Sequence, residues 1–162
     1  MARSARTSPY QNSGGVVPDD VSKQIIEQLQ QDGRRSYAAV GKAVGLSEAA
    51  VRQRVQRLLD GGVMQIVAVT DPLTLGFRRQ TMIAVKCDGD LEQVADQLAD
   101  INEIDYVVLT AGSFDLLLEV VCEDDDHLLE ILSQVRGVPS VTSTETFVYL
   151  KLCKQTYTWG TR

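Results

Sequence analysis

The chain has 162 residues, of which 44% are hydrophobic and 23% are charged, and its formal net charge at pH 7 is −6. This composition is typical of a globular protein and excludes a fibrous or low-complexity chain. No apolar run reaches the roughly 18 residues of a membrane-spanning helix, and the N-terminus lacks the apolar segment of a signal peptide. We therefore expect a cytoplasmic protein without a membrane partner.

Charge is distributed unevenly along the chain. Residues 1–62 contain nine Lys and Arg against six Asp and Glu, whereas residues 63–162 contain seven against sixteen. The first part therefore carries a formal charge of +3 and the second a charge of −9. This asymmetry is typical of a basic nucleic-acid-binding module joined to an acidic partner domain. The acidic part would repel phosphate and restrict DNA to the N-terminal part.

Residues 1–18 are rich in Ser, Gly and Pro and have no apolar period, which predicts a disordered basic arm. Arg3 and Arg6 could follow the DNA backbone, as arms do in other DNA-binding proteins. A dispensable tail is the simpler interpretation of the same residues.

Residues 19–62 predict three helices, the last two of which form a helix-turn-helix. The first helix begins at Asp19 or Asp20 and ends near Gln31. The second begins after Ser36 and ends at Gly45, and the third begins after Ser47 and ends at Gly61-Gly62. In the third helix Val51, Val55 and Leu58 recur at the spacing of one buried face.

The opposite face of the third helix is the candidate DNA-reading surface. Small residues in its first turn permit close approach to a major groove about 12 Å wide, and Gln and Arg can make bidentate contacts with base edges. Arginines before the second helix could hold phosphates, whereas Arg54 lies nearer the buried face and could pair with a carboxylate of the chain. The candidate DNA-binding residues are Arg34, Arg35, Ser47, Glu48, Ala49, Ala50, Arg52, Gln53, Arg54, Gln56 and Arg57. An ordinary solvated face of a helical hairpin is the alternative.

The remaining chain predicts a linker and a second domain. Residues 63–77 contain the strand-like run Val63 to Val69 and a hinge with Asp71-Pro72 and Gly76. Residues 78–157 show two strand-helix-strand units, with strands expected over 80–87, 105–110, 115–122 and 141–152, and residues 158–162 form a tail. Two such units predict a ferredoxin-like βαββαβ domain, so the fold class is α+β. Large side chains on both faces of the last strand predict that the open sheet face pairs with a second copy, giving a homodimer.

No catalytic, metal or cofactor site is predicted. The three cysteines, Cys87, Cys122 and Cys153, are far apart and lack any CxxC spacing, so buried structural thiols are expected. His127, the single histidine, stands at an acidic helix start. The chain has no Gly-rich phosphate loop following a strand and no Ser-His-Asp set. We expect a protein that is not an enzyme.

The runs GLSEAAVRQRVQRL, TDPLTLG and TAGSFDLLLEV, in this order, resemble the leucine-responsive regulator and AsnC (Lrp/AsnC) family of transcription factors. The resemblance covers roughly residues 19–157. It implies sequence-selective binding to double-stranded DNA, dimers that assemble into tetramers or octamers, a place on the nucleoid, and an amino acid or related small metabolite as effector.

The same resemblance implies an effector loop with the family's glycine-x-x-Asp pattern, in which Ala111 stands where Thr is usual. Its residues are Thr110, Ala111, Gly112, Ser113, Phe114 and Asp115. Backbone N–H groups near the glycine would approach a ligand carboxylate, and Asp115 would accept from an ammonium. Two alternatives remain open: a nucleoid-architecture protein that wraps DNA with low specificity, and a haem-pathway decarboxylase-like enzyme of related fold.

Overall fold

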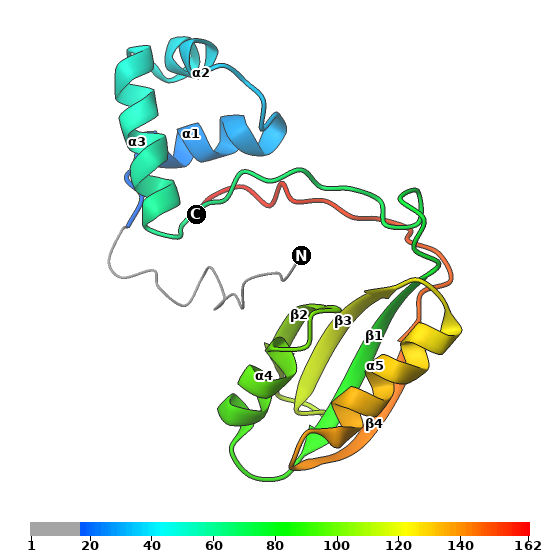
Figure 1. Cartoon of the computed structure of the whole chain (residues 1–162). Coiled ribbons are helices and arrows are strands. Elements are labelled where there is room, and N and C mark those ends of the chain that lie inside the picture. The colour runs from blue at the N-terminus through cyan, green and yellow to red at the C-terminus, as the bar shows by residue number, and fades with distance from the viewer. Residues whose placement is uncertain (1–16) are drawn as a thin grey trace. The chain divides into compact units, whose positions relative to one another are not determined.

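The computed structural model describes residues 17–162, so the arm expected over residues 1–18 lies, except for Val17 and Pro18, outside the described residues. The described chain divides into two compact units (Figure 1). One contains residues 17–69 and 153–162, and the other contains residues 70–152.

The first unit is built from three capped helices, α1 (Asp20–Gln31), α2 (Tyr37–Val44) and α3 (Glu48–Asp60). Side-chain oxygens of Asp19, Ser36 and Ser47 accept from backbone N–H groups in the first turns of these helices, as the sequence predicted. Apolar faces of the three helices meet in one core, whose fully or nearly fully buried members are Ile25, Leu29, Val40, Val51 and Val55. The predicted helix-turn-helix is confirmed.

The corner between α2 and α3 is unusually tight. Gly45 ends α2 in the left-handed region, with φ 75°, where glycine carries no steric penalty. The Leu46 N–H donates to the Gly41 carbonyl oxygen at 2.9 Å. A Cβ atom at Gly41 would lie 2.5 Å from the Leu46 carbonyl oxygen, closer than carbon and oxygen can approach. The corner therefore requires glycine at two positions, of which sequence reasoning recognised only Gly45.

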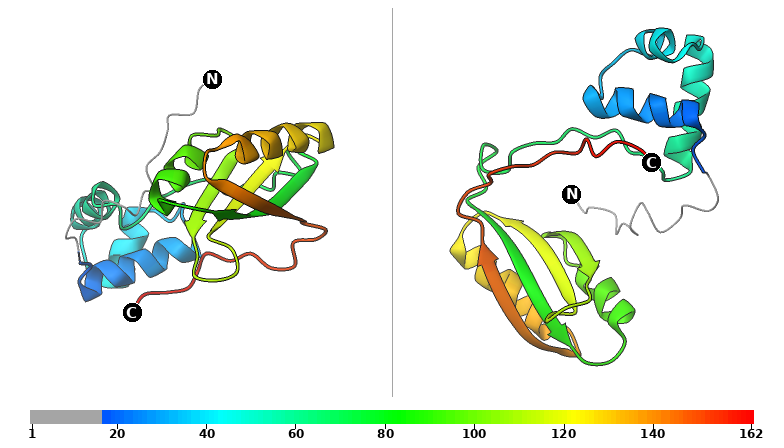
Figure 2. Two further views of the ribbon diagram at one scale, coloured as in Figure 1. Left: turned by 90° about the horizontal axis from the view of Figure 1, so that it is seen from below. Right: turned by 180° about the vertical axis from the view of Figure 1, so that it is seen from behind.

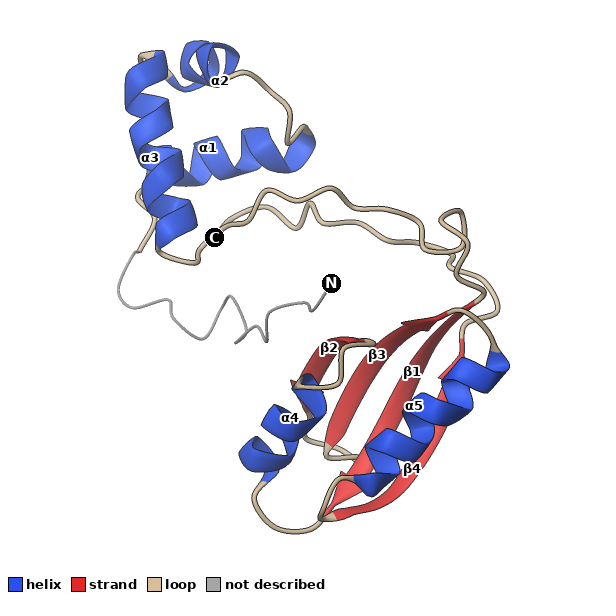
Figure 3. Cartoon of the chain, viewed as in Figure 1, coloured by secondary structure: helices blue, strands red, loops and turns tan. Residues whose placement is uncertain are grey.

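The second unit is a four-stranded antiparallel sheet with two helices on one face (Figure 3). Its elements are β1 (Arg79–Cys87), α4 (Leu91–Ala99), β2 (Ile104–Leu109), β3 (Leu116–Cys122), α5 (Asp125–Gly137) and β4 (Val141–Val148). The strand order is β2-β3-β1-β4, which is the ferredoxin-like βαββαβ arrangement that the sequence predicted.

Strand alternation determines which side chains enter the core of this unit. Ile83, Val85, Leu116 and Leu118 face the helices and are fully buried, together with Leu98 of α4. Burial raises the pKa of the Cys87 and Cys122 thiols, which fits the predicted structural role. Cys153 is exposed, so the expectation of a buried thiol is wrong there, because the chain has left the sheet after Val148.

Two expected strands differ from the structure. Residues 63–69 form no strand, and the side chains of Ile66, Val67 and Val69 are exposed. β4 ends at Val148 instead of Leu152, because the hydrogen bond from the Tyr149 N–H to the Gln80 oxygen, 2.9 Å, is the last between β4 and β1. Residues 153–162 then belong to the first unit.

One buried hydroxyl in the sheet has no hydrogen-bond partner. The Thr81 side chain is fully buried on the helix-covered face of β1, and its Oγ1 bonds to nothing among the described residues. We expect Thr81→Val to raise the free energy of unfolding by about 1 kcal/mol, because a methyl group replaces an unsatisfied polar group of similar shape. Chemical denaturation measures this. Thr144→Val is the control with the opposite expected sign, since the Thr144 Oγ1 accepts from Arg136 at 2.9 Å.

Candidate DNA interface and effector loop

The candidate DNA-reading surface is the exposed face of α3. Val51, Val55 and Leu58 are almost completely buried and hold the opposite face against the helical core. Gln53 and Arg57 are exposed, and their side chains bond to no other residue in the described part of the chain. Their amide and guanidinium groups are therefore free to meet a base edge or a phosphate.

Other polar residues of α3 lie along the helix surface. The Arg52 Nη2 is 2.8 Å from the Glu48 Oε1, and its guanidinium carbon lies 5.2 Å from the centre of the Tyr37 ring. The Gln56 Nε2 donates to the Asp60 Oδ1 at 2.7 Å. Exposed contacts of this kind contribute little to stability, so these side chains can exchange them for DNA contacts.

Arg54 has a different position. Its Nη1 lies 2.7 Å from the Asp19 Oδ2 and 3.0 Å from the Ser22 Oγ, so it ties α3 to the start of α1. Hydrogen bonds from Ser22 and then from Arg54 hold the pKa of the Asp19 carboxyl well below its usual range. The intramolecular pairing considered for Arg54 is the one that forms.

The arginines before α2 lie near polar partners of their own unit. The Arg34 side chain is almost fully exposed, with its Nε 3.9 Å from an Asp32 oxygen, and the Arg35 Nη1 donates to the Gln28 Oε1. Ser47 is occupied as a cap, with its Oγ accepting from the Ala50 N–H at 3.2 Å. Ala49 is exposed and Ala50 is half-buried, so the first turn of α3 has the small profile that the sequence predicted.

The predicted effector loop connects β2 to β3. The Thr110 N–H donates to the Asp115 carbonyl oxygen at 2.9 Å, and the Thr110 Oγ1 donates to the Phe114 oxygen at 2.6 Å. One oxygen of the Asp115 carboxylate accepts from the Cys87 N–H at 2.9 Å, so Asp115 also fastens the loop to β1. The Lys86 Nζ lies 5.9 Å from the centre of the Phe114 ring.

Gly112 is not required by the turn itself. Its φ is not positive, and a Cβ atom there would meet nothing within 4 Å. Ala111 and Ser113 beside it are exposed, so open space surrounds the backbone of the loop. A small ligand or another subunit can therefore approach this backbone closely.

Comparison with known proteins matches both units to one family. Residues 19–59 match an AsnC-type helix-turn-helix domain, and residues 77–162 match a C-terminal dimeric alpha+beta barrel domain of AsnC-type regulators. The chain belongs to the AsnC family of transcriptional regulators. It is therefore a DNA-binding protein with a dimeric C-terminal domain.

Curated relatives of this AsnC-family regulator span almost the whole chain. The HTH-type transcriptional regulator FL11 of Pyrococcus horikoshii is 32% identical over 143 residues, which cover 87% of this chain and 95% of the relative. The proline dehydrogenase transcriptional activator of Rhizobium radiobacter is 32% identical over 144 residues, covering 85% and 92%. The structure of Escherichia coli AsnC has the same fold, with a TM-score of 0.74, 22% identity and coverage of 88% and 98%.

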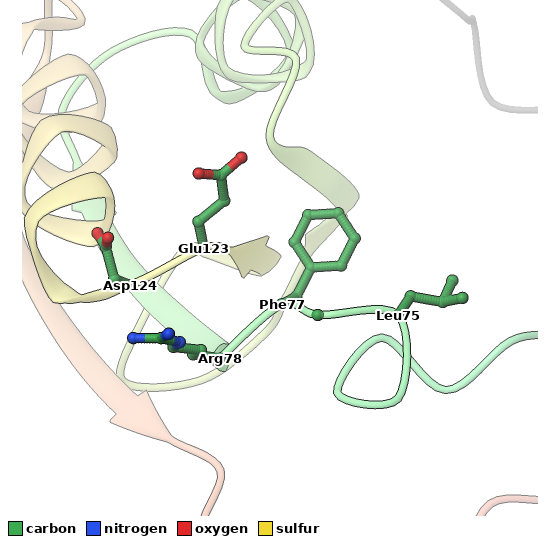
Figure 4. A pocket seen from close by; sticks show the side chains of 6 residues that line it. Leu75, Phe77, Arg78, Glu123 and Asp124 are labelled. Carbon is green, nitrogen blue, oxygen red and sulfur yellow. The ribbon is translucent and has the colours of Figure 1, made fainter.

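A hollow that sequence reasoning did not identify lies at the hinge of the regulator. It measures about 330 Å³ and is lined by Leu75, Gly76, Phe77, Arg78, Glu123 and Asp124 (Figure 4). These residues stand where β1 begins and β3 ends, whereas the effector loop leads into the start of β3. The hollow is thus separate from the effector loop. No signal in the sequence points to this hollow, because the segment with Arg78 and the segment with Glu123 and Asp124 are far apart along the chain.

Three further observations concern metal binding, the single histidine and membrane-spanning helices. No group of three or more His, Cys, Asp or Glu residues within residues 17–162 could hold a metal ion. The His127 Nδ1 accepts from the Glu123 N–H at 3.4 Å, a local contact at the start of α5. Among the described helices, none is long and apolar enough to cross a membrane.

The geometry separates two roles for the arginines of α3. If Arg57 holds a phosphate, we expect Arg57→Ala to lower the slope of log affinity against log salt concentration by about one. If Arg57 reads a base, the substitution should relax specificity at one base pair. Thermal stability should be unchanged in either case. Arg54→Ala should instead lower the melting temperature, because it removes the ion pair with Asp19 that ties α3 to the start of α1. Fluorescence anisotropy with labelled DNA and thermal denaturation measure the two effects. Equal DNA binding by Arg57→Ala and the unaltered protein would place Arg57 outside the interface.

Proposed function

We propose that this regulator binds promoter DNA as a symmetric dimer, with the two copies of α3 reading two half-sites. The observation that carries this proposal is the exposed face of α3, where Gln53 and Arg57 have no partner within residues 17–162 while Arg54 holds the helix in place. Two-fold symmetric helix-turn-helix proteins read half-sites about one helical turn apart. The positive charge of the first unit supports the proposal that this unit, and not the acidic second unit, contacts DNA.

The open face of the sheet supports a specific mode of pairing. In Figure 2 the strands lie in front of α4 and α5 when the molecule is seen from behind, and no element of the second unit covers this face. Strand alternation places Met82, Val108, Leu117 and Phe147 on it, and Phe147 is 46% exposed. The Gln80 Nε2 donates to the Glu119 Oε1 at 2.8 Å on the same face. We infer that two such faces meet in the dimer.

We further propose that the loop from Thr110 to Asp115 binds the effector and that an α-amino acid or a related metabolite is its ligand. The open backbone around Gly112 and the unused oxygen of Asp115 suit a carboxylate and an ammonium group, respectively. The regulator NMB0573 of Neisseria meningitidis, whose structure is a complex with L-Met, has the same fold with a TM-score of 0.74 and 22% identity. Assembly of dimers into tetramers or octamers on the nucleoid, in the cytoplasm, belongs to the same proposal.

The test is DNA affinity as a function of salt, for the DNA upstream of the protein's own gene and for a scrambled fragment, each with and without the twenty amino acids. Tighter binding to the native fragment, shifted by an amino acid, is the expected result. Equal, steeply salt-dependent binding to both fragments would favour the architectural alternative. Absence of binding at low salt would contradict the proposal and reopen the enzyme alternative.

A further inference from the structure

The C-terminal ten residues form part of the DNA-binding unit, although they follow the acidic sheet domain in sequence. Residues 153–162 group with the three helices, and not with the sheet that they leave. The Thr161 Oγ1 donates to the Glu27 Oε1 of α1 at 2.6 Å, and this contact is partly buried. We name residues 153–162 the C-terminal segment.

The charge of this segment matches the unit it joins. Within residues 17–69 seven Lys and Arg stand against six Asp and Glu, whereas the C-terminal segment has Lys154 and Arg162 and no acidic side chain. The segment therefore raises the side-chain charge of the described unit from +1 to +3. Residues 70–152, from which it emerges, contain five basic against sixteen acidic residues. The positive charge of the segment is thus held on the helical unit and not on the acidic domain.

The segment exposes two basic and two aromatic side chains, which suit a negatively charged polymer such as DNA. Lys154 and Arg162 are exposed and pair with no acidic residue that the structure describes. Between them Tyr157 is 48% exposed and Trp159 is 77% exposed. An indole so exposed is unusual, because aromatic side chains bury large areas and dominate the energetics of interfaces. Cations supply salt-dependent contacts with phosphates, and exposed aromatic rings beside them offer apolar area that can cover the sugar-phosphate backbone.

We propose that the C-terminal segment is a second DNA contact of this regulator, in which Lys154 and Arg162 hold backbone phosphates beside the site read by α3. Trp159 and Tyr157 lie against the sugar-phosphate backbone. The hydrogen bond between Thr161 and Glu27 joins the segment to α1, so these contacts are made by the same compact unit as the α3 contacts. The inference rests on the proposed function, and it adds phosphate contacts without base specificity.

Trp159 makes the test direct, because it is the only tryptophan of the chain. The full-length protein is titrated with a sequence-scrambled duplex at low salt, and tryptophan emission and acrylamide quenching are recorded beside anisotropy of the labelled DNA. We expect the emission to change in parallel with DNA binding and the quenching constant to fall, because DNA covers the ring. The Lys154→Gln/Arg162→Gln double variant should lower the salt slope by about two for each protomer. The control variant Arg78→Gln/Arg136→Gln, which removes two charges from the second unit, should keep the slope.

Each outcome decides between the two proposals. DNA binding with unchanged tryptophan emission, or with the same slope in the Lys154→Gln/Arg162→Gln variant and the unaltered protein, would overturn the second contact and leave the proposed function standing. A tryptophan signal that depends on protein concentration without DNA would assign the segment to contacts between subunits and overturn the inference. Absence of DNA binding by the unaltered protein at low salt would overturn both proposals.

Discussion

Phe147→Asp is expected to convert the dimer into monomers and to weaken DNA binding. Phe147 lies on the open face of the edge strand β4, directly opposite Met82 of β1, and is 46% exposed in the single chain. Because only 46% of the Phe147 surface remains to be covered, its burial in the dimer contributes about 0.7–1.5 kcal/mol, and two-fold symmetry doubles the loss to about 1.5–3 kcal/mol. This corresponds to a rise of about 10- to 10²-fold in the dimer dissociation constant, before the added cost of burying two carboxylates.

Sedimentation equilibrium over a range of concentrations measures this constant directly. Leu129→Asp is the matched control, because Leu129 is 61% exposed on α5, the helix-covered side of the sheet. Because two linked half-site contacts become one, DNA affinity of the Phe147 variant should fall more steeply than that of Arg57→Ala. A Phe147→Asp protein that stays dimeric while Leu129→Asp dissociates would place the dimer interface on the helices instead of the open face.

The elements that could be predicted from the sequence are those with strong local signals. The caps at Asp19, Ser36 and Ser47 set the helix starts, and apolar spacing such as that of Val51, Val55 and Leu58 set the buried faces. Alternation and acidic helix starts located the βαββαβ domain. In each case a few neighbouring residues determine the local conformation.

The features that escaped prediction depend on contacts distant in sequence. Residues 63–69 have the β-branched composition of a strand, yet a strand also needs a hydrogen-bonded neighbour, which composition does not specify. Leu150 and Leu152 continue the apolar alternation of β4, but the ladder with β1 ends before them. The position of Arg54 on α3 predicts pairing with a carboxylate, but only the fold shows that this carboxylate is Asp19, 35 positions away. The contact between Thr161 and Glu27 likewise joins residues far apart in sequence, so no local pattern predicts it.

Gly41→Ala is expected to destabilise the first unit, although alanine is normally the better helix residue. An added Cβ would lie 2.5 Å from the Leu46 carbonyl oxygen, and this oxygen belongs to backbone held by the hydrogen bond from the Leu46 N–H to the Gly41 oxygen. Relief requires α2 and the corner to separate, and overpacking of this kind costs about 1–3 kcal/mol. The gain of helix propensity, about 1 kcal/mol, offsets only part of this loss. Because the corner sets the angle of α3, DNA affinity should fall together with stability.

Gly137→Ala provides the matched control for this change. Gly137 ends α5 without a positive φ, and a Cβ atom there would meet nothing within 4 Å. The same substitution should therefore be neutral or stabilise the second unit by a few tenths to about 1 kcal/mol. Urea denaturation followed by far-ultraviolet circular dichroism measures the stability of each variant against the unaltered protein. A loss of stability in Gly41→Ala together with a gain in Gly137→Ala would establish that the corner has no space for a side chain at Gly41. Equal stability of Gly41→Ala and the unaltered protein would show instead that the corner can open. In that case the protein would keep its DNA affinity without the close approach of α2 to the corner.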